Sequence, residues 1–569
     1  MKVVIVGGVA GGASAAARLR RLDESAEIVM IERTGYVSYA NCGLPYYVGD
    51  VITDKRKLTL QTPESFKARF SIDVRVRQEV VSIDREGRHV VVRRLDDGSL
   101  YREPYDRLVL SPGARPVVPD IPGVDDARVF TLRTVEDTYA IKDFVDAERA
   151  SRAVVVGAGF IGLEMAENLR ERGMEVAIVQ RSSQVMKLID PDMAAIVHNR
   201  LSDAGIDLLL NTHIEGIARV DVDAEGPLLV HTAEHDPIPC DMVVLAIGVA
   251  PDSSLARDAG LELGLRGSIK VDAHLRTSDP NIYAVGDAIE VHERVTGEAS
   301  LISLAGPANK QGRLAADNIA GRPRAYGKTL GTSVLKLFEL TVASTGITSA
   351  SARRSGVNFD AVVLTPPNHA TYYPGAQSMT LKVLFEKGTG RIIGAQAIGR
   401  EGVDKRIDVL ATAVRAEMTA QDLSELDLAY APPFSSAKDP VNMAGFMIEN
   451  ILDGLVSQAQ WSEALAAAEK VPAAVLLDTR TEGEFARGHV PGAVNVPLDE
   501  LRDRLDELPR DGMLFAYCQS GLRSYVACRM LAQHGFDCVN IAGGYGFLSH
   551  ARRDGERVGR SVGPCGLEA

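Results

Sequence analysis

Two stretches of the chain share one order of hydrophobic and polar positions. Each has a short apolar run, a glycine-rich turn and a longer helix-forming stretch, namely VVIVGGVAGGASAAARLRR from Val3 and AVVVGAGFIGLEMAENLRERG from Ala153. The pattern predicts a strand, a tight turn and a helix whose first N–H groups and positive dipole end face a pyrophosphate. One such match is weak evidence, but two in one chain predict two dinucleotide-binding domains.

The first copy departs from the G-x-G-x-x-G spacing, because Val9 takes the place of the middle glycine. Glu32 supports the site, since it closes the next apolar run twenty residues after Gly12, where a carboxylate can accept hydrogen bonds from ribose hydroxyls. The predicted contacts to this nucleotide come from Gly7, Gly8, Ala10, Gly11, Gly12, Glu32 and Arg33.

The second copy is intact, with Gly157, Gly159 and Gly162 at the three glycine positions. Gln180 stands where the first copy has its glutamate, and Arg181 follows it. A neutral amide does not repel a 2′-phosphate as a carboxylate would, so both NADH and NADPH fit this site.

A later segment, residues 281–288, places Asp287 directly after a strand and a glycine. It resembles the second FAD signature of the two-dinucleotide-binding flavoproteins, in which the aspartate binds the ribityl chain. The strands at 108–114 and 244–251 resemble the connections between the FAD and NAD domains of that superfamily, which implies an NAD domain inserted into a split FAD domain. The resemblance adds these cofactor-binding residues: Ser111, Gly113, Gly248, Asp287 and Asn309.

The motifs predict an α/β protein with two Rossmann-like domains, an α+β dimerisation domain and a C-terminal α/β domain. Residues from about 329 to 453, with strands such as Met379–Phe385, resemble the superfamily's dimerisation domain, so we expect a homodimer. The predicted boundaries are an FAD-binding domain in two parts (1–115 and 251–325), an inserted NAD(P)-binding domain (116–250), a dimerisation domain (326–453), a polar, alanine-rich linker (454–470) and a last domain (471–560).

Composition narrows the class of protein further. A net charge of -13 gives no reason to expect nucleic acid, which needs a concentrated basic surface. Six cysteines in so long a chain, without a CxxC pair, favour neither a disulfide framework nor zinc, so we expect a reducing cytoplasm and no metal. The N-terminal apolar run is too short for a signal peptide and no other run is long enough for a bilayer, so we expect no membrane association.

Cys42 is the only sulfur in SYANCGLP, which follows the first dinucleotide motif. A single cysteine is usually a packed, structural residue. Beside FAD, however, its thiolate could attack a sulfur–sulfur bond, and reduced flavin could then reduce the resulting disulfide and release the thiolate again. Glutathione-reductase-like enzymes have a CxxxxC loop, whereas no second cysteine lies near Cys42. Its oxidised partner is therefore a substrate thiol, in a mixed disulfide, or an oxygen, in a sulfenic acid.

Five segments resemble the CoA-disulfide reductase family over roughly residues 1–450: GGVAGGASAAARLRR, SYANCGLPYY, HATYYPG, DKRIDVLATA and YAPPFSSAKD. The resemblance implies that Cys42 forms a mixed disulfide with coenzyme A. It also implies that Tyr372 and Tyr430 face the active site across the dimer interface, although Tyr372 beside Tyr373 is equally compatible with packing. The implied CoA contacts are Ser14, Arg18, Arg21, Ser38, Asn41 and Lys438, with Arg18 and Arg21 about one helical turn apart and suited to phosphates.

The C-terminal region resembles a single rhodanese domain through DTR at 478–480, EFARGHVPGAVNVP at 484–497 and YCQSGLRS at 517–524. Cys518 is expected to end a strand and start a loop of inward-pointing N–H groups beside a helix N-terminus and Arg523, a setting that lowers a thiol pKa and holds a persulfide anion. A cysteine phosphatase would place five residues between Cys and Arg, but only four intervene here. We expect Cys528 and Cys538 to be packing residues, and the role of Cys565 is undecided.

Together the two resemblances predict an NAD(P)H- and FAD-dependent reductase of CoA persulfide, polysulfide or CoA disulfide, similar to NADH-dependent persulfide and polysulfide reductases. Cys518 would supply sulfane sulfur to CoA or directly to Cys42. The alternatives are a plain CoA-disulfide reductase, an NADH peroxidase or oxidase that uses Cys42 as a sulfenic acid, and a tail that binds sulfur or a partner without turnover.

Overall fold

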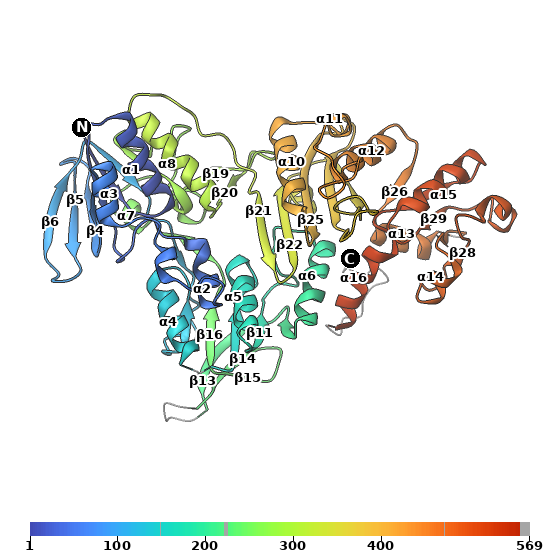
Figure 1. The fold of residues 1–569 in the computed structure, drawn as a ribbon, viewed down its shortest axis with the longest axis horizontal. Helices are drawn as coiled ribbons and strands as arrows, with labels where there is room; N and C mark the ends of the chain where they lie inside the picture. The colour runs from blue at the N-terminus through green and yellow to red at the C-terminus, as the bar shows by residue number, and fades with distance from the viewer. Residues whose placement is uncertain (148–149, 221–225, 472, 558–569) are drawn as a thin grey trace. The chain divides into compact units, whose positions relative to one another are not determined.

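The computed structural model describes residues 1–147, 150–220, 226–471 and 473–557 (Figure 1). They divide into two compact units. The first consists of Met1–Ser183 and Gly205–Gly331, and the second of Gln184–Ala204 and the described residues from Thr332 onward. The predicted fold class is confirmed, because the first unit holds two parallel sheets and the second holds one antiparallel and one parallel sheet.

The first parallel sheet has the strand order β18-β7-β1-β2-β3. Its central strands are apolar along nearly their whole length, because helices cover both faces of such a sheet. Helices α1 (Ala10–Leu22) and α8 (Ala305–Ile319) lie side by side (Figure 1), and their small residues permit close contact. The strands are β1 (Lys2–Val6), β2 (Glu27–Ile31), β3 (Asp73–Arg75), β7 (Arg107–Leu110) and β18 (Ile282–Ala284).

The second parallel sheet has the order β12-β11-β10-β16-β9 and its own apolar core. Its strands are β9 (Val129–Thr131), β10 (Arg152–Val156), β11 (Glu175–Val179), β12 (Ile206–Leu209) and β16 (Met242–Leu245), with helices α4 (Val135–Asp146) and α5 (Phe160–Glu171). Strands β8 (Ala114–Pro116) and β17 (Val249–Pro251) pair antiparallel at the two passages between the sheets.

Smaller elements complete the first unit. Two three-stranded antiparallel sheets comprise β4 (Gln78–Asp84), β5 (His89–Arg94) and β6 (Leu100–Pro104), and β13 (Ile214–Arg219), β14 (Leu228–Thr232) and β15 (Ile238–Cys240). A two-stranded ribbon comprises β19 (Val291–His292) and β20 (Ala299–Ser300). The remaining α-helices are α2 (Leu44–Val48), α3 (Pro63–Phe70) and α7 (Ser254–Asp258).

The antiparallel sheet of the second unit has the order β21-β22-β25-β24-β23. Its central strand β25 is buried at every residue because helices pack against it, among them α10. The strands are β21 (Ser333–Leu337), β22 (Leu340–Gly346), β23 (Phe359–Leu364), β24 (Thr380–Glu386) and β25 (Ile392–Gly399). The helices are α9 (Ser349–Arg354), α10 (Val403–Ala416), α11 (Ala420–Glu425) and α12 (Pro440–Leu452).

The parallel sheet of the second unit has the order β26-β30-β29-β27-β28. Its strands are β26 (Ser457–Ala459), β27 (Val475–Asp478), β28 (Val494–Asn495), β29 (Leu514–Tyr517) and β30 (Cys538–Ile541). Its helices are α13 (Trp461–Lys470), α14 (Glu482–Ala486), α15 (Leu522–Gln533) and α16 (Gly544–Arg557). None of the helices in the described part of the chain is long and apolar enough to span a membrane.

The segment predicted as a linker, 454–470, is structured. Strand β26 pairs with β30, and α13 buries Trp461, whose indole N–H donates to the carbonyl of Gly544 at 2.9 Å. The alanine-rich composition suggested a tether, but the apolar face of α13 is part of the last domain's core.

Helix α6 (Pro191–Asp203) also departs from the predicted boundaries, because residues 184–204 belong to the second unit. It packs against α16, where His198 Nδ1 lies 2.8 Å from Asp554 Oδ2 and Asn199 donates to the carbonyl of His550. The backbone N–H of Val185 donates to His198 Nε2, so the proton of this imidazole is on Nδ1 and points at Asp554.

Candidate active sites

Two glycines leave no room for a side chain, and they occupy the last glycine position of each dinucleotide motif. A Cβ atom on Gly12 would lie 1.9 Å from the carbonyl oxygen of Gly7, and one on Gly162 would lie 1.9 Å from that of Gly157. The helix can therefore pack directly on its turn in both copies, which aims the helix N-terminus across the end of the sheet.

Val9 replaces the middle glycine of the first motif without changing the backbone. It is the N-cap residue of α1 with φ -100°, and Gly159 is the N-cap residue of α5 with φ -83°. Both values are open to any L-residue, and a Cβ on Gly159 would meet no protein atom within 4 Å. Val9 thus preserves the turn, and the position is constrained by how closely a ligand approaches.

The turns have the donor groups that a dinucleotide needs. Neither α1 nor α5 has a side-chain cap, which leaves their first N–H groups open to an anion. Glu32 Oε2 accepts from the N–H of Gly8 at 2.9 Å, and Gln180 Oε1 accepts from that of Ala158 at 3.0 Å. The two polar side chains hold the same place in their respective turns, so the residues present fit FAD in the first and a nicotinamide dinucleotide in the second.

Ser111 and Asp287, both predicted to bind FAD, lie at the ends of neighbouring strands of the first parallel sheet. A Cβ on Gly11 would meet Ser111 Oγ at 2.8 Å, so Ser111 borders the first turn, while Gly113 has a left-handed φ of +74°. Asp287 lies in a 3-10 turn after β18, and its Oδ2 is 3.1 Å from Arg133 Nη2.

Three other predicted cofactor residues have specific surroundings. Arg33 is paired with Asp252 at 3.0 Å, which directs its charge away from the turn. Asn309 on α8 accepts from Ser14 Oγ at 2.5 Å, so a residue predicted for FAD and one predicted for CoA are in direct contact. Gly248 lies between β16 and β17 with φ +121°, and a Cβ atom on it would meet no other atom within 4 Å.

The predicted CoA contacts are not equally available for phosphate. The Nε and Nη2 atoms of Arg18 each lie 2.7 Å from Asp317 Oδ1, and Asp317 is buried, whereas Arg21 is exposed at the end of α1. Ser38 is held to the first turn by its backbone, whose N–H donates to Gly8. Arg21 is therefore the open cation of the predicted pair, and Arg18 is neutralised by its own domain.

Cys42 lies in a 3-10 turn, Asn41–Gly43, directly before α2, and is exposed. Burial of its surroundings raises the pKa of the thiol, the carboxylates of Glu164 and Asp287 raise it further, and Arg133 opposes them. Burial and the two carboxylates thus favour the thiol of Cys42, and the guanidinium of Arg133 favours its thiolate.

Arg133 was not anticipated from the sequence. It follows β9 in TLRTVED and lies between Asp287 and Asn41. With the Asn41 amide oriented to satisfy both groups, Nδ2 donates to the Arg133 carbonyl at 3.1 Å and Oδ1 accepts from Nη1 at 3.2 Å. The signal that could have found it is its place between a strand of one dinucleotide domain and the capping box of α4.

Glu164 was also missed, although it stands two residues after the last glycine of the second motif. Burial first, and Glu167 second, raise its pKa to about 7, while the hydroxyl of Tyr46 donates to Oε1 at 3.5 Å and opposes the shift. The same burial and carboxylates raise the pKa of the Tyr46 phenol. Helix α5 of the second motif thus brings a readily protonated carboxyl beside Cys42.

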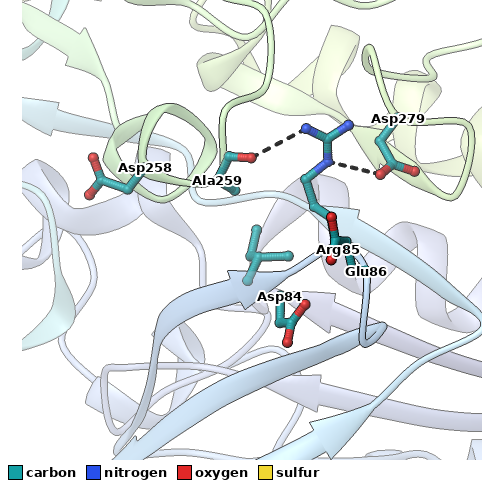
Figure 2. Close-up of a pocket in the computed structure, with 7 residues that line it drawn as sticks. Asp84, Arg85, Glu86, Asp258, Ala259 and Asp279 are labelled. Atoms are coloured by element: carbon teal, nitrogen blue, oxygen red, sulfur yellow. Dashed lines mark hydrogen bonds and ion pairs between the residues drawn. The ribbon is translucent and has the colours of Figure 1, made fainter.

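An open hollow elsewhere in the first unit belongs to a structural contact. It has a volume of about 650 Å³ and is lined by residues of the β4–β5 turn, α7 and the segment before β18. Figure 2 shows Arg85 reaching across it to Asp279 at 3.0 Å and to the carbonyl of Ala259. This ion pair attaches the small sheet to the FAD-type domain, and no residue predicted for cofactor or substrate lines the hollow.

Tyr372, Tyr430 and Lys438 lie in the second unit and are exposed. The hydroxyls of the two tyrosines are 2.8 Å apart, and their hydrogen bond raises the pKa of Tyr372. Tyr373 instead packs edge-on against His369. The structure thus separates the two adjacent tyrosines into one that pairs with Tyr430 and one that packs.

Cys518 directly follows β29, as predicted, and its sulfur is buried under the loop that leads into α15. The N–H of Gly521 donates to Sγ at 3.1 Å, and the hydroxyl of Ser524 lies 3.6 Å from it. Ser524 is in turn 2.7 Å from Asn540 on β30. A backbone donor aimed at the sulfur is the arrangement that stabilises a thiolate or persulfide anion.

The outer face of this loop is held by α16. The N–H of Tyr545 donates to the carbonyl of Cys518 at 2.7 Å, and that of Gly546 donates to the carbonyl of Gln519 at 2.9 Å. The carbonyls of Cys518 and Gln519 thus face α16, whereas the N–H of Gly521 faces the sulfur of Cys518.

Arg523 forms two hydrogen bonds of 2.7 Å with the carboxylate of Glu484. Glu484 first, and the nearby Cys518 as well, raise the pKa of Arg523, and the guanidinium lowers the pKa of Glu484 to about 2. The bidentate pair fixes the orientation of the guanidinium beside the Cys518 loop. Among the described residues, no group of histidines, cysteines and carboxylates could hold a metal ion.

Two glycine-turn domains, a single cysteine beside them and a cysteine loop in a parallel sheet define a flavin-type disulfide reductase with a sulfur-handling domain. The chain belongs to the pyridine nucleotide-disulphide oxidoreductase family, whose model matches residues 1–312. The family's dimerisation domain matches 332–440, and a rhodanese-like domain matches 459–546. The family typically uses FAD and NAD(P)H.

Individual relatives show which members of this family the chain is similar to. A coenzyme A disulfide reductase of Staphylococcus aureus (strain JH9) is 36% identical over 446 residues, which cover 78% of this chain and 99% of the relative. The structure of reduced Bacillus anthracis CoADR-RHD is 49% identical with a TM-score of 0.93, covering 96% of this chain and 98% of that one. An NAD-dependent persulfide reductase from A. fulgidus is 39% identical with a TM-score of 0.89, covering 96% and 100%. The predicted family resemblance and enzyme class are confirmed.

Proposed function

We propose that this protein is a homodimeric NAD(P)H-dependent reductase of CoA persulfide or polysulfide, in which Cys42 is the redox cysteine and Cys518 supplies sulfane sulfur. The observation that carries the proposal is the Gly521 N–H aimed at Cys518 Sγ, in a chain whose first unit also has Cys42, a cysteine that lies between the two dinucleotide turns in sequence. A disulfide reductase alone has no use for a second anion-stabilising sulfur site.

Cys42 as thiolate would attack the inner sulfur of CoA persulfide. The new bond joins Cys42 to the CoA sulfur, the sulfur–sulfur bond breaks, and hydrosulfide leaves with the electron pair. Two electrons and a proton then return Cys42 to the thiolate and release CoA thiol. FAD and NAD(P)H, when bound at the two dinucleotide turns, would supply the two electrons.

The surrounding residues have roles in this step that follow from their positions. Arg133 favours the thiolate of Cys42. Glu164, with a pKa of about 7, can hold a proton near the sulfur at neutral pH. Tyr372 and Tyr430 would donate hydrogen bonds to the leaving sulfur from the partner chain, and Arg21 would bind CoA phosphate.

Cys518 would carry the sulfane sulfur as a persulfide, whose terminal anion the Gly521 N–H and Arg523 stabilise. A CoA thiolate or Cys42 would take that sulfur by attacking it, which regenerates the Cys518 thiolate. CoA is the natural carrier because its pantetheine arm is long and flexible.

The test is anaerobic NADH and NADPH oxidation by the purified protein with four acceptors: CoA persulfide, polysulfide, CoA disulfide and hydrogen peroxide. We expect the first two to be reduced fastest, with release of sulfide. Much faster reduction of CoA disulfide or of peroxide would overturn the proposal in favour of a plain CoA-disulfide reductase or a peroxidase.

The variant Cys518→Ser distinguishes the role of Cys518 from that of Cys42. We expect it to abolish sulfide production from a sulfane-sulfur donor that only the tail can use, such as thiosulfate, and to leave CoA disulfide reduction unchanged. Cys42→Ser should abolish both. Unchanged persulfide and polysulfide rates in Cys518→Ser would remove the sulfur relay and leave the reductase.

A further inference from the structure

Two cysteines of the last domain, Cys528 and Cys538, have no part in the proposed reaction and lie against each other. Cys528 is on the buried face of α15 and Cys538 is on β30, which packs beside that helix. The Cys538 thiol donates to the carbonyl oxygen of Cys528 at 3.2 Å, and each thiol influences the pKa of the other. The side chain of Cys538 therefore ends at the helical turn that carries Cys528.

The pair is asymmetric in exposure. Cys528 is 2% exposed and belongs to the apolar core, whereas Cys538 is partly exposed at the edge of that core. Cys538 is therefore the more accessible of the two thiols to an oxidant in solvent.

The pair is asymmetric in acidity as well. The interaction between the thiols lowers the pKa of Cys538, and burial opposes it. The same interaction, followed by burial and the nearby Cys538 and Cys518, raises the pKa of Cys528. An accessible, more acidic thiol backed by a buried, less acidic one is the arrangement of an attacking and a resolving cysteine.

We propose that Cys528 and Cys538 form a reversible intradomain disulfide, a redox-sensitive modification site beside the Cys518 loop. The oxidant is a low-molecular-weight disulfide, R–S–S–R. Cys538 thiolate attacks one sulfur, which forms Cys538–S–S–R and expels R–S⁻. The Cys528 thiol then attacks the Cys538 sulfur, which forms the Cys528–Cys538 bond and expels a second R–S⁻. Two protein thiols are oxidised, one disulfide is reduced to two thiols, and the protein protons go to the leaving thiolates.

The consequence concerns the Cys518 loop, because α15 and β30 both contribute to it. Ser524 on α15 lies near Cys518 Sγ and is hydrogen-bonded to Asn540 on β30. A covalent bond between the same helix and strand would fix their spacing beside this pair, since a disulfide holds two Cα atoms at about 4.4–6.8 Å. Oxidation would therefore lower the rate of sulfur transfer at Cys518.

The sequence makes the test direct, because trypsin cleaves after Arg523, Arg529 and Arg552. Cys528 falls in 524–529, Cys538 in 530–552 and Cys518 in an earlier peptide. The full-length holoenzyme is treated with CoA disulfide, free thiols are alkylated under denaturing conditions, and unreduced peptides are measured by mass spectrometry. We expect peptides 524–529 and 530–552 to appear as one species that has lost two hydrogens and separates on reduction.

Controls come from the chain itself. Reaction of Cys42 with CoA shows that the oxidant was active, and Cys240, buried on β15, should be recovered fully alkylated. In Cys528→Ser, Cys538 should retain CoA as a mixed disulfide, because the resolving thiol is missing. Full alkylation of both Cys528 and Cys538 while Cys42 has reacted would overturn the proposal, as would a stable CoA adduct on Cys538 in the unsubstituted chain.

Activity gives a second measurement. Thiosulfate sulfurtransferase turnover at Cys518 should fall in the oxidised protein, recover on reduction, and be insensitive to the same treatment in Cys538→Ser, which can form neither the CoA adduct nor the disulfide. Equal loss in the oxidised Cys538→Ser variant would show that Cys518 itself is the oxidised group and would remove the regulatory part of the proposal. The modification does not depend on which acceptor Cys42 reduces.

Discussion

At the scale of single residues, the two cysteines proposed to react lie in different surroundings. Cys518 has a donor built into its own loop, the N–H of Gly521, with Arg523 beside it. Cys42 has one guanidinium opposed by two carboxylates, those of Glu164 and Asp287. The reactivity of Cys42 therefore depends on whether the nearby carboxyls are protonated.

Glu164→Gln is predicted to shift the alkylation midpoint of Cys42 to lower pH, because it removes a negative charge that raises the pKa of that thiol. The measurement is the rate of Cys42 carboxamidomethylation against pH in the holoenzyme. Glu171→Gln, an exposed carboxylate on the same helix, is the control and should leave the profile in place. An unchanged midpoint in Glu164→Gln would show that the carboxylate has no influence on the sulfur.

The same substitution has a pH-dependent effect on stability, and the sign follows from the raised pKa of about 7. Well below pH 4.5 the carboxyl is protonated in both the folded and the unfolded chain, so its ionisation does not affect stability there. As the pH rises from 4.5 to 7 the unfolded chain ionises first, which destabilises the folded protein by about 3 kcal/mol at most. Glu164→Gln should therefore raise the melting temperature above pH 7 and not at pH 4.5; the reverse order would exclude a raised pKa.

At the scale of elements, the strand–turn–helix unit occurs twice. Its turn has room for a side chain at the middle glycine position but not at the last one. A Cβ on the last glycine would overlap the carbonyl oxygen of the first glycine, whereas a Cβ at the middle position of the second turn would meet no protein atom, and its φ is ordinary. Val9 in the first copy is a natural example of a side chain at the tolerant position.

Gly162→Ala and Gly159→Ala make a matched pair in the second turn. Gly162→Ala should lower the melting temperature and weaken NADH binding, because its methyl group would overlap the carbonyl of Gly157. Gly159→Ala should leave the melting temperature near that of the unsubstituted protein while raising KM for NADH, because only the bound nucleotide approaches it. Thermal unfolding and steady-state kinetics check the pair, and equal melting temperatures would contradict the overlap.

At the scale of the whole molecule, the chain brings one reductase body and one rhodanese-like domain together, with a dimerisation domain between them in sequence. Tyr372 and Tyr430 present a hydrogen-bonded, exposed pair on that dimerisation domain. If the pair serves the Cys42 of the partner chain, a functional site needs residues from both chains of the dimer.

Mixed dimers test this arrangement. Cys42→Ser and the double variant Tyr372→Ala with Tyr430→Ala should each be inactive alone. Co-expression should restore about a quarter of the activity, because half of the dimers are mixed and each mixed dimer has one complete site. Persulfide reduction by the co-expressed mixture is the measurement, and mixed dimers purified through two different tags should have about half of the unsubstituted activity. No recovery in dimers that have formed would place the tyrosines at the Cys42 of their own chain.

The sequence alone determined the two glycine turns, the place of Glu32 and Gln180, the single Cys42 and the Cys518 loop, because each depends on residues close together in the chain. Only the tertiary structure brought Arg133 and Glu164 to Cys42, paired Arg18 with Asp317, and placed the Cys538 thiol against the backbone of Cys528. It also placed β26 and α13 in the last domain, and α6 with the second unit. Such contacts depend on which helix and strand faces pack together, and no local periodicity encodes the partner of a buried charge or thiol.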